Sequence, residues 1–170
     1  MYFTVLIFLL GICVGSFLNV LIYRLPHPLP ITGRSFCPKC KRKILWQDNI
    51  PVISFVLLRG RCRFCHSPIG IQYPLVELTT GTLFVVTFLF YYPNLLSIIY
   101  YLLLICALIV IFFTDLRYQI IPDKIIYSAI ILTSVFQIIN YKSAIINITN
   151  PLFSSFGAGL FFLSLVTLTR

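Results

Sequence analysis

Long apolar runs are the feature that most constrains this chain. Residues 1–23 are almost entirely hydrophobic, and further apolar segments lie near 75–92, 95–114, 125–140 and 152–169. A helix of about 20 apolar residues crosses a hydrocarbon core of about 30 Å. Hydrophobic residues make up 59% of the chain and charged residues only 10%, whereas a soluble domain carries roughly 25% charge. The sequence therefore predicts an all-α, polytopic membrane protein in the lipid bilayer, with about five transmembrane helices.

The first apolar run has a rival interpretation as a cleaved signal peptide. Residues 1–23 lack a basic start, are long for a signal peptide, and are followed rather than preceded by positive charge. A first transmembrane helix at 1–23 is therefore favoured. Residues 24–74 then form a polar insert that contains proline and glycine, and residues 75–170 form a second membrane region.

The basic residues orient these predicted helices. The net charge is +9, and nine of the 13 Lys and Arg residues lie between Arg24 and Arg63. If the insert is cytoplasmic, 12 of the 13 lie inside and only Lys142 lies outside, as the positive-inside rule requires. We therefore expect the N-terminus outside and residues 24–74 in the cytoplasm. The same placement argues against nucleic acid as a partner, because membrane orientation accounts for the charge.

Four cysteines of the insert form a second pattern. Cys37-Pro-Lys-Cys40 and Cys62-Arg-Phe-Cys65 are CxxC knuckles with 21 residues between them. Two such knuckles bring four thiolates to one tetrahedral zinc ion, which can fold a segment too small to have a core. A structural zinc site is therefore predicted, although iron binds the same ligands. Disulfides are disfavoured by a cytoplasmic location, and a redox role by the absence of a surrounding βαβ pattern.

Two of the four acidic residues have structural interpretations beside functional ones. Ionisable groups in membrane segments are costly, so each is a candidate for function. Glu77 lies at the start of the second apolar segment, where we expect it to begin the helix or to pair with Arg24. Asp123 follows Pro122 in an order typical of a helix start, and is equally well interpreted as a capping residue.

Asp115 is the strongest candidate for chemistry. It follows the apolar segment 95–114, where a carboxylate opposes the helix macrodipole and therefore does not stabilise the helix. Partial desolvation there is expected to poise the group between its charged and neutral forms. With a second aspartate it would form an aspartic-protease dyad that shares one proton. The alternative is an interfacial ion pair with Arg117 or Lys124.

Several ordered motifs run along the whole chain. They are GSFLNVLIYRLP at 15–26, the two CxxC knuckles, Asn49-Ile-Pro51 with Ser54, Arg59-Gly60-Arg61-Cys62, Ile69, Tyr73-Pro74-Leu75-Val76-Glu77, Thr114-Asp115-Leu116 and Ile121-Pro122-Asp123. In this order they resemble the type IV prepilin leader peptidase/N-methyltransferase family, which are membrane aspartic proteases of the GxGD type.

The resemblance implies a role for each region. Residues 24–74 would be the zinc- and methyltransferase-associated region, and residues 75–170 the transmembrane peptidase region. Asp115 would match the first catalytic aspartate, with Asp123, Glu77 and Arg117 as supporting residues. S-adenosylmethionine would be the methyl donor. The substrates would be prepilins or pseudopilins with a basic leader, cut after a glycine at the cytoplasmic face of the bacterial inner membrane.

The chain departs from the family pattern in one respect. The second catalytic aspartate of the family lies in a Gly-x-Gly-Asp motif, and no such motif occurs in the 170 residues. The nearest stretch, Gly157-Ala158-Gly159-Leu160, lacks the aspartate. One carboxylate does not do the work of a dyad, so we expect a C-terminally truncated chain with impaired cleavage. The alternatives are a catalytically silent membrane protein whose basic zinc module binds pilin-assembly or secretion partners, and a methyltransferase without peptidase activity. The oligomeric state is not predicted.

Overall fold

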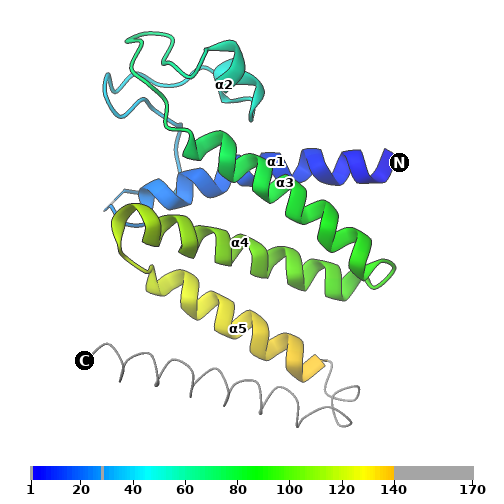
Figure 1. Cartoon of the computed structure of the whole chain (residues 1–170). Helices are drawn as coiled ribbons and strands as arrows, with labels where there is room; N and C mark the ends of the chain where they lie inside the picture. The colour runs from blue at the N-terminus through cyan, green and yellow to red at the C-terminus, as the bar shows by residue number, and fades with distance from the viewer. Residues whose placement is uncertain (1, 28, 140–170) are drawn as a thin grey trace, which may run out of the picture. The chain divides into compact units, whose positions relative to one another are not determined.

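The computed structural model describes residues 2–27 and 29–139, and their regular structure is helical (Figure 1). Within them no strand forms, and only two isolated β-bridges occur. The elements are α1 (Tyr2–Arg24), the 3-10 turn η1 (Trp46–Asn49), α2 (Ile53–Leu57), α3 (Gln72–Tyr91), α4 (Leu95–Tyr118) and α5 (Asp123–Ile139). The predicted all-α class is confirmed.

Three of these helices are long and apolar enough to cross a membrane. They are α1, α3 and α4, with 23, 20 and 24 residues respectively. The fourth predicted span corresponds to α5, which has 17 residues, and the fifth, near 152–169, lies outside the described residues. The chain is therefore a helical membrane protein, with three of the five predicted spans present as full-length helices in the described part.

Helix α4 ends later than the apolar run suggests. The apolar segment at 95–114 stops just before Asp115, but the helix continues to Tyr118. Gln119 then adopts a left-handed conformation with φ of 53°, and its N–H donates to the carbonyl of Asp115 at 2.8 Å. This left-handed cap, and not the first charged residue, ends the helix. Asp115 therefore lies in the last turn of α4.

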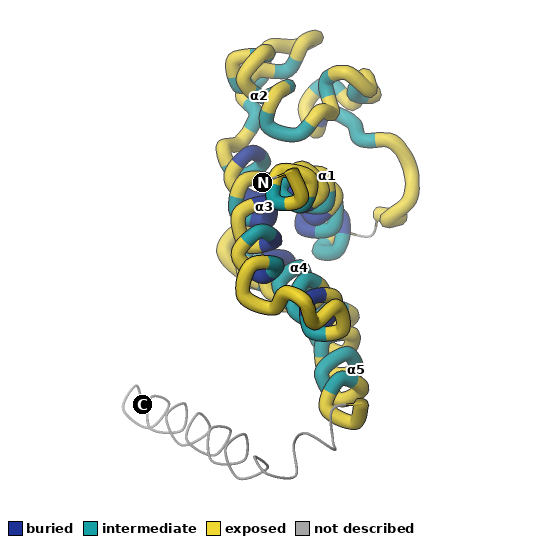
Figure 2. Tube along the Cα trace, turned by 90° about the vertical axis from the view of Figure 1, so that its right-hand side faces the viewer, coloured by how far each residue is buried: buried dark blue, intermediate teal, exposed yellow. Residues whose placement is uncertain are grey.

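Residues 1–130 form one compact unit, in which α1, α3 and α4 pack together. Buried segments follow the sides where these three helices meet, while their other sides are exposed (Figure 2). All three helices contribute to one core cluster. Its members are Leu18, Ile22, Val76, Ile109 and Val110.

Glycines bring α1 and α3 unusually close. A Cβ atom on Gly11 would lie 2.7 Å from the Cα of Gly81, and one on Gly15 would lie 2.8 Å from the Cα of Glu77. Small residues are what allow membrane helices to approach at backbone distance. The contact at Gly15 fixes Glu77 directly against α1.

Arg24 fixes the start of the insert, which in the structure comprises residues 25–71 between α1 and α3. Arg24 is buried, and its guanidinium donates to backbone carbonyls of the following chain. The distances are 2.9 Å from Nη1 to the carbonyls of Pro30, Ile31 and Thr32, and 3.2 Å from Nη2 to those of Gly33 and Arg34. The chain after α1 is therefore wrapped around one cation.

The close α1–α3 contact gives a first prediction. Gly15→Val places a branched side chain against the backbone of α3, so we expect a loss of about 1–3 kcal/mol in stability, as for overpacked cores. Thermal unfolding in detergent measures the change. Gly70→Ala is the matched control, because the nearest atom to its added Cβ is 4.0 Å away. Equal midpoints for both variants would contradict the packing described.

Candidate functional site

The four cysteines of the two knuckles meet in one cluster. Their sulfur atoms all lie within 4.8 Å of one another, and the Sγ atoms of Cys37 and Cys65 are 3.8 Å apart. Tetrahedral coordination with metal–sulfur bonds of about 2.3 Å requires sulfur–sulfur distances of about 3.8 Å. The cluster therefore has the dimensions and the soft ligands of a tetrahedral metal site.

Each knuckle repeats the backbone of the other. In both, the carbonyl of the first cysteine accepts from the N–H four residues on, and its N–H donates to the carbonyl five residues on. The fourth residue after the first cysteine is Lys41 in one knuckle and His66 in the other, with left-handed φ values of 59° and 53°. Single antiparallel bridges, Phe36–Lys43 and Arg61–Pro68, close the knuckles. Local sequence thus forms two equivalent turns that each present two sulfurs.

The thiols of the cluster differ in pKa, and therefore in how readily they ionise to bind a metal. Hydrogen bonds from the side chain and backbone of Ser67 lower the pKa of Cys65 to about 6, so this thiol is ionised at neutral pH. The backbone amide of Arg42 lowers the pKa of Cys40, but desolvation and hydrogen bonds with the other three thiols outweigh it and raise the pKa to about 11. A metal ion that binds here must therefore displace protons.

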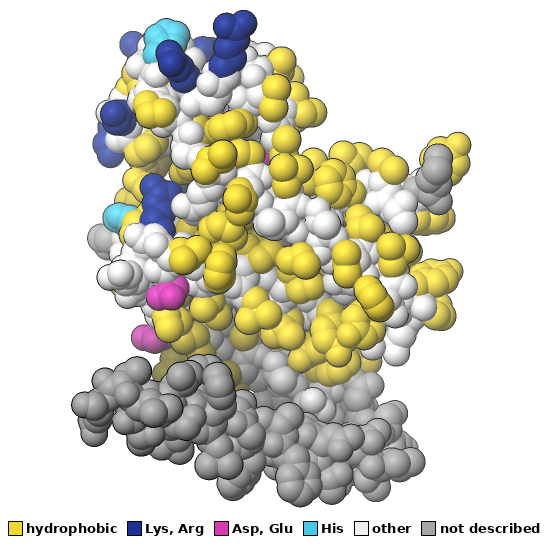
Figure 3. All heavy atoms as spheres, viewed as in Figure 1, with side chains coloured by type: hydrophobic (Ala, Val, Ile, Leu, Met, Phe, Trp, Pro, Cys, Tyr) yellow, Lys and Arg dark blue, Asp and Glu magenta, His cyan; other side chains and the backbone are white. Residues whose placement is uncertain are grey.

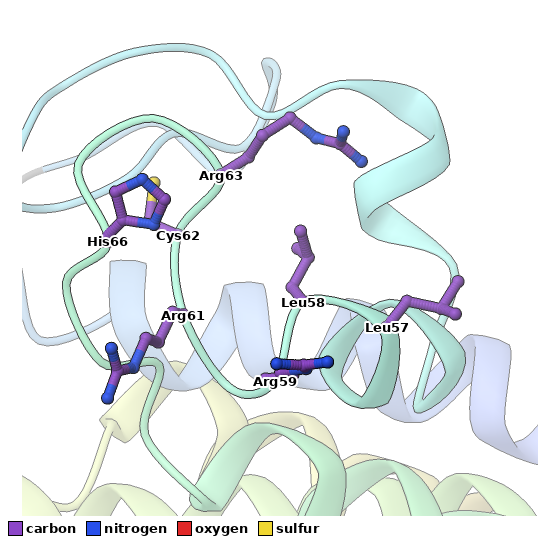
Figure 4. Close-up of a pocket in the computed structure, with 7 residues that line it drawn as sticks. All are labelled: Leu57, Leu58, Arg59, Arg61, Cys62, Arg63 and His66. Atoms are coloured by element: carbon purple, nitrogen blue, oxygen red, sulfur yellow. The ribbon is translucent and has the colours of Figure 1, made fainter.

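Basic side chains gather over the insert, whereas the helices present a largely hydrophobic face (Figure 3). Arg59, Arg61 and Arg63 line a hollow of about 510 Å³ beside the second knuckle, together with His66 (Figure 4). Arg63 also donates to both carboxylate oxygens of Asp48, at 2.8 and 2.6 Å. The positive surface offsets the negative charge that four thiolates would carry.

Glu77 holds the insert on α3. It is buried in the second turn of that helix, and its Oε2 accepts from the backbone N–H of Val52 at 2.7 Å. Val52 has a φ of 61°, which is rare for a β-branched residue. The predicted pairing of Glu77 with Arg24 is wrong, because the guanidinium of Arg24 binds backbone carbonyls.

A cleft of about 560 Å³ lies between the insert, the C-terminal half of α1 and the first turns of α3. Glu77, Ser16 and Asn19 are among the residues that line it. The side-chain Nδ2 of Asn19 donates to the carbonyl of Tyr73 at 3.0 Å, while its buried Oδ1 has no hydrogen-bond partner among the residues that the structure describes. Asn19 was not predicted as a site residue. The sequence feature that could have marked it is a polar amide within an apolar membrane segment.

Of the predicted peptidase residues, Glu77 and Arg117 line this cleft, whereas Asp115 and Asp123 are not among its lining residues. Asp115 is exposed, so the desolvation expected for it is not supplied by the described packing. It forms no ion pair with Arg117 or Lys124, and the one ion pair of residues 2–27 and 29–139 joins Arg63 to Asp48. Arg117 instead donates to Oε1 of Gln72 at 3.2 Å.

Asp123 is the first residue of α5, as its interpretation as a helix-start residue predicts. The carbonyl of Pro122 accepts from Ile125 at 3.0 Å and from Ile126 at 3.3 Å, which begins the helix. Asp115 and Asp123 thus flank the short connection between α4 and α5.

Two family models match this chain, one over the region of the cysteine cluster and one over the region of Asp115. The family model of the bacterial Peptidase A24 N-terminal domain matches residues 9–91, which contain the cysteine cluster, Asn19 and Glu77. The model of the type IV leader peptidase family matches residues 102–170, which contain Asp115 and Asp123. The chain belongs to the type IV leader peptidase family.

Curated relatives of this leader peptidase family carry one common name, prepilin leader peptidase/N-methyltransferase. The protein of Myxococcus xanthus is 54% identical over 83 residues, or 48% of this chain and 25% of that protein. The Klebsiella pneumoniae protein is 40% identical over 124 residues, covering 69% and 54%. The Vibrio cholerae protein is 30% identical over 145 residues, covering 79% and 56%. The chain thus spans about half the length of these relatives or less, and no solved structure matches it significantly.

The cysteine cluster gives the second prediction. We expect about one thiophilic metal ion per chain in protein purified under reducing conditions, measured by elemental mass spectrometry. Cys65→Ser should lower the metal content and lower the unfolding midpoint, because one of four ligands is lost. Cys13→Ser is the control, since Cys13 lies in α1 outside the cluster. Metal-free protein with four reduced thiols would contradict the prediction.

Proposed function

We propose that this chain acts as a membrane-embedded prepilin leader peptidase that also N-methylates the new N-terminus. The observation that carries the proposal is the position of Asp115, exposed in the last turn of α4 and within the segment that matches the peptidase family model. Curated relatives with this pair of activities in their name support it. The proposed substrates are prepilins or pseudopilins, whose basic leader is removed after a glycine.

Asp115 is proposed as one member of a catalytic pair of aspartates. In such a pair one carboxylate takes a proton from water, and the other, protonated, polarises the scissile carbonyl. The exposed position of Asp115 leaves its carboxylate open to water and to a substrate helix in the bilayer. The 170 residues contain no Gly-x-Gly-Asp motif, so cleavage is proposed to need a carboxylate supplied from outside them. Asp123 and Arg117 are proposed to support the α4–α5 connection rather than to react.

Zinc and S-adenosylmethionine are proposed to bind at the cysteine cluster and the neighbouring cleft, and not at Asp115. Zinc fits the four-sulfur cluster, where a closed tetrahedral site supplies folding free energy to the insert. S-adenosylmethionine would supply the methyl group. The cleft of about 560 Å³ is in the size range of pockets for such molecules, about 300–1,000 Å³. Residues 24–74 are thus proposed as the zinc and methyltransferase region, and residues 75–170 as the peptidase region.

The membrane location and orientation of the chain are proposed from the distribution of its basic residues. Nine of the 13 basic residues lie from Arg24 to Arg63, so the insert would lie in the cytoplasm and the N-terminus outside, in the bacterial inner membrane. Both proposed sites would then act at the cytoplasmic face. We propose no nucleic acid partner, because this charge is explained by the membrane topology.

A second candidate function is supported by the arginine hollow. Arg59 and Arg61 are exposed beside the second knuckle, and the hollow that they line with Arg63 suits an acidic partner surface (Figure 4). In this alternative the chain is catalytically silent, and its basic zinc module binds pilin-assembly or secretion partners. The alternative predicts partner binding that does not depend on Asp115.

A chimera tests the peptidase proposal. Residues 1–139 of this chain are joined to the remaining C-terminal part of the Klebsiella pneumoniae relative, and leader removal from a prepilin is followed by gel shift. We expect cleavage, and a loss of about a thousandfold or more in Asp115→Asn, because removal of a group that acts as a unit with its partner removes most of the catalysis. Asp123→Asn is the matched control and should retain most of the activity. Equal cleavage by Asp115→Asn would overturn the assignment, and an inactive chimera that still binds partners would favour the silent module.

A further inference from the structure

Glu77 is a buried carboxylate that forms no ion pair with any of the described residues. Its side chain contacts two hydrogen-bond donors, the backbone N–H of Val52 and the hydroxyl of Ser16. Arg24 also lines the cleft, but its guanidinium is occupied by five backbone carbonyls. Among the described residues the one ion pair lies elsewhere, between Asp48 and Arg63. A buried carboxylate without a cation is costly, and a carboxylate has about four acceptor positions, so Glu77 can take further donors.

Asn19 places a second unsatisfied acceptor in the same region. Asn19 is 4% exposed, and its Oδ1 is the buried side-chain atom that has no hydrogen-bond partner within the described part. Its Nδ2 is bound to the carbonyl of Tyr73, one helical turn from Glu77 on α3. Ser16, which contacts Glu77, is one turn from Asn19 on α1. Buried polar atoms are rarely left unpaired, so an orphan acceptor in the same cleft as a carboxylate indicates a missing donor.

These two acceptors define the chemistry of the missing group. An ammonium group carries both a positive charge and three N–H donors, which are what the Glu77 carboxylate and the Oδ1 of Asn19 each accept. The sulfonium centre of S-adenosylmethionine carries charge but no N–H donor, and its methionine α-ammonium group is a competing cation that the effect of Glu77→Gln on S-adenosylmethionine binding would reveal. A calcium or magnesium ion would require about six oxygen ligands, and the other carboxylate that lines the cleft, Asp48, is already paired with Arg63.

We propose that the cleft binds the α-ammonium group of the peptide that is methylated, with Glu77 and Asn19 as its acceptors. This inference rests on the proposed N-methyltransferase function, whose acceptor atom is by definition a nitrogen. The cleft also holds aromatic side chains from both α1 and the insert, Tyr23, Phe36 and Phe55, which suit the apolar residues of a membrane-embedded peptide. The site therefore recognises a free peptide N-terminus.

Glu77 is also placed to prepare the nitrogen for reaction. An ammonium nitrogen has no free electron pair, so one N–H proton must leave before methyl transfer. Glu77 takes that proton and becomes neutral, and the nitrogen pair then attacks the methyl carbon of the sulfonium donor. The carbon–sulfur bond breaks with its electron pair going to sulfur, which becomes a neutral thioether. The methylated nitrogen carries the positive charge, so the atoms and charges balance.

A binding experiment separates this inference from the activity itself. The metal-loaded chain in lipid nanodiscs is titrated calorimetrically with leucyl-leucinamide and with its N-acetyl form, which lacks the ammonium group. We expect the free amine to bind about tenfold or more tightly than the acetylated form, because a charged hydrogen bond is lost on acetylation. Glu77→Gln keeps an acceptor for Val52 but removes the charge, and should reduce this preference to about twofold or less. Metal content and unfolding midpoint check that the variant is folded.

The control is Asp48→Asn, a second carboxylate that lines the cleft but already has Arg63 as its cation. It should retain the amine preference. Equal binding of both peptides by the unmodified chain, or an unchanged preference in Glu77→Gln, would overturn the inference even if methylation occurs. Amine preference without any methylation would instead leave this site standing and refute the proposed methyltransferase. If Glu77→Gln weakens only S-adenosylmethionine, the acceptor assignment is wrong.

Discussion

The hydrogen bond between the carboxylate of Glu77 and the backbone N–H of Val52 joins the two halves of this structure. One half is the packed membrane helices α1, α3 and α4, and the other is the small polar insert. Glu77 is in place because the Cα of α3 at this position approaches α1 at Gly15, where any side chain would collide. The donor is in place because Val52 adopts an unusual backbone conformation with a positive φ of 61°. The hydrogen bond between Glu77 and Val52 therefore depends both on the packing of α3 against α1 and on the backbone conformation of the insert.

The insert has few other means of holding a fixed structure. Its regular elements are the 3-10 turn η1 and the short helix α2, and of its apolar side chains only Cys37 is fully buried within the described residues. Arg24 fixes its start, and the four sulfurs join two sequence-distant knuckles. Metal binding and the Glu77 bond act on different parts of the insert. Together they form the cleft in which we place the methyl-transfer chemistry.

The features that the sequence predicts best are those fixed by local pattern. The cysteine cluster follows from CxxC spacing because each knuckle is a local turn, and α1, α3 and α4 follow from apolar length. The end of α4 was misplaced, because charge at Asp115 does not stop a helix that Gln119 caps four residues later. The exposure of Asp115 within the described packing could not be predicted, because a position at a helix end does not reveal which side of the helix is packed.

Non-local polar contacts were beyond sequence reasoning for a physical reason. The pairing of Glu77 with Arg24 was expected from opposite charge, yet backbone groups satisfy both side chains. Backbone donors and acceptors occur at almost every residue, so no residue pattern marks the one that a side chain will choose. Asn19 was quoted in a motif but given no role, since its orphan oxygen is visible only once α1 and α3 are packed.

The buried carboxylate of Glu77 on α3 holds the insert in place, and the amide proton of Val52 reports directly on this hydrogen bond. Hydrogen exchange of this amide, followed in metal-loaded protein, should be slow, and Glu77→Leu should accelerate it strongly because the acceptor is removed. Amides within the α1 and α3 helices should be little affected and serve as the internal reference. Fast exchange at Val52 in the unmodified protein, or a rate unchanged by Glu77→Leu, would contradict the account.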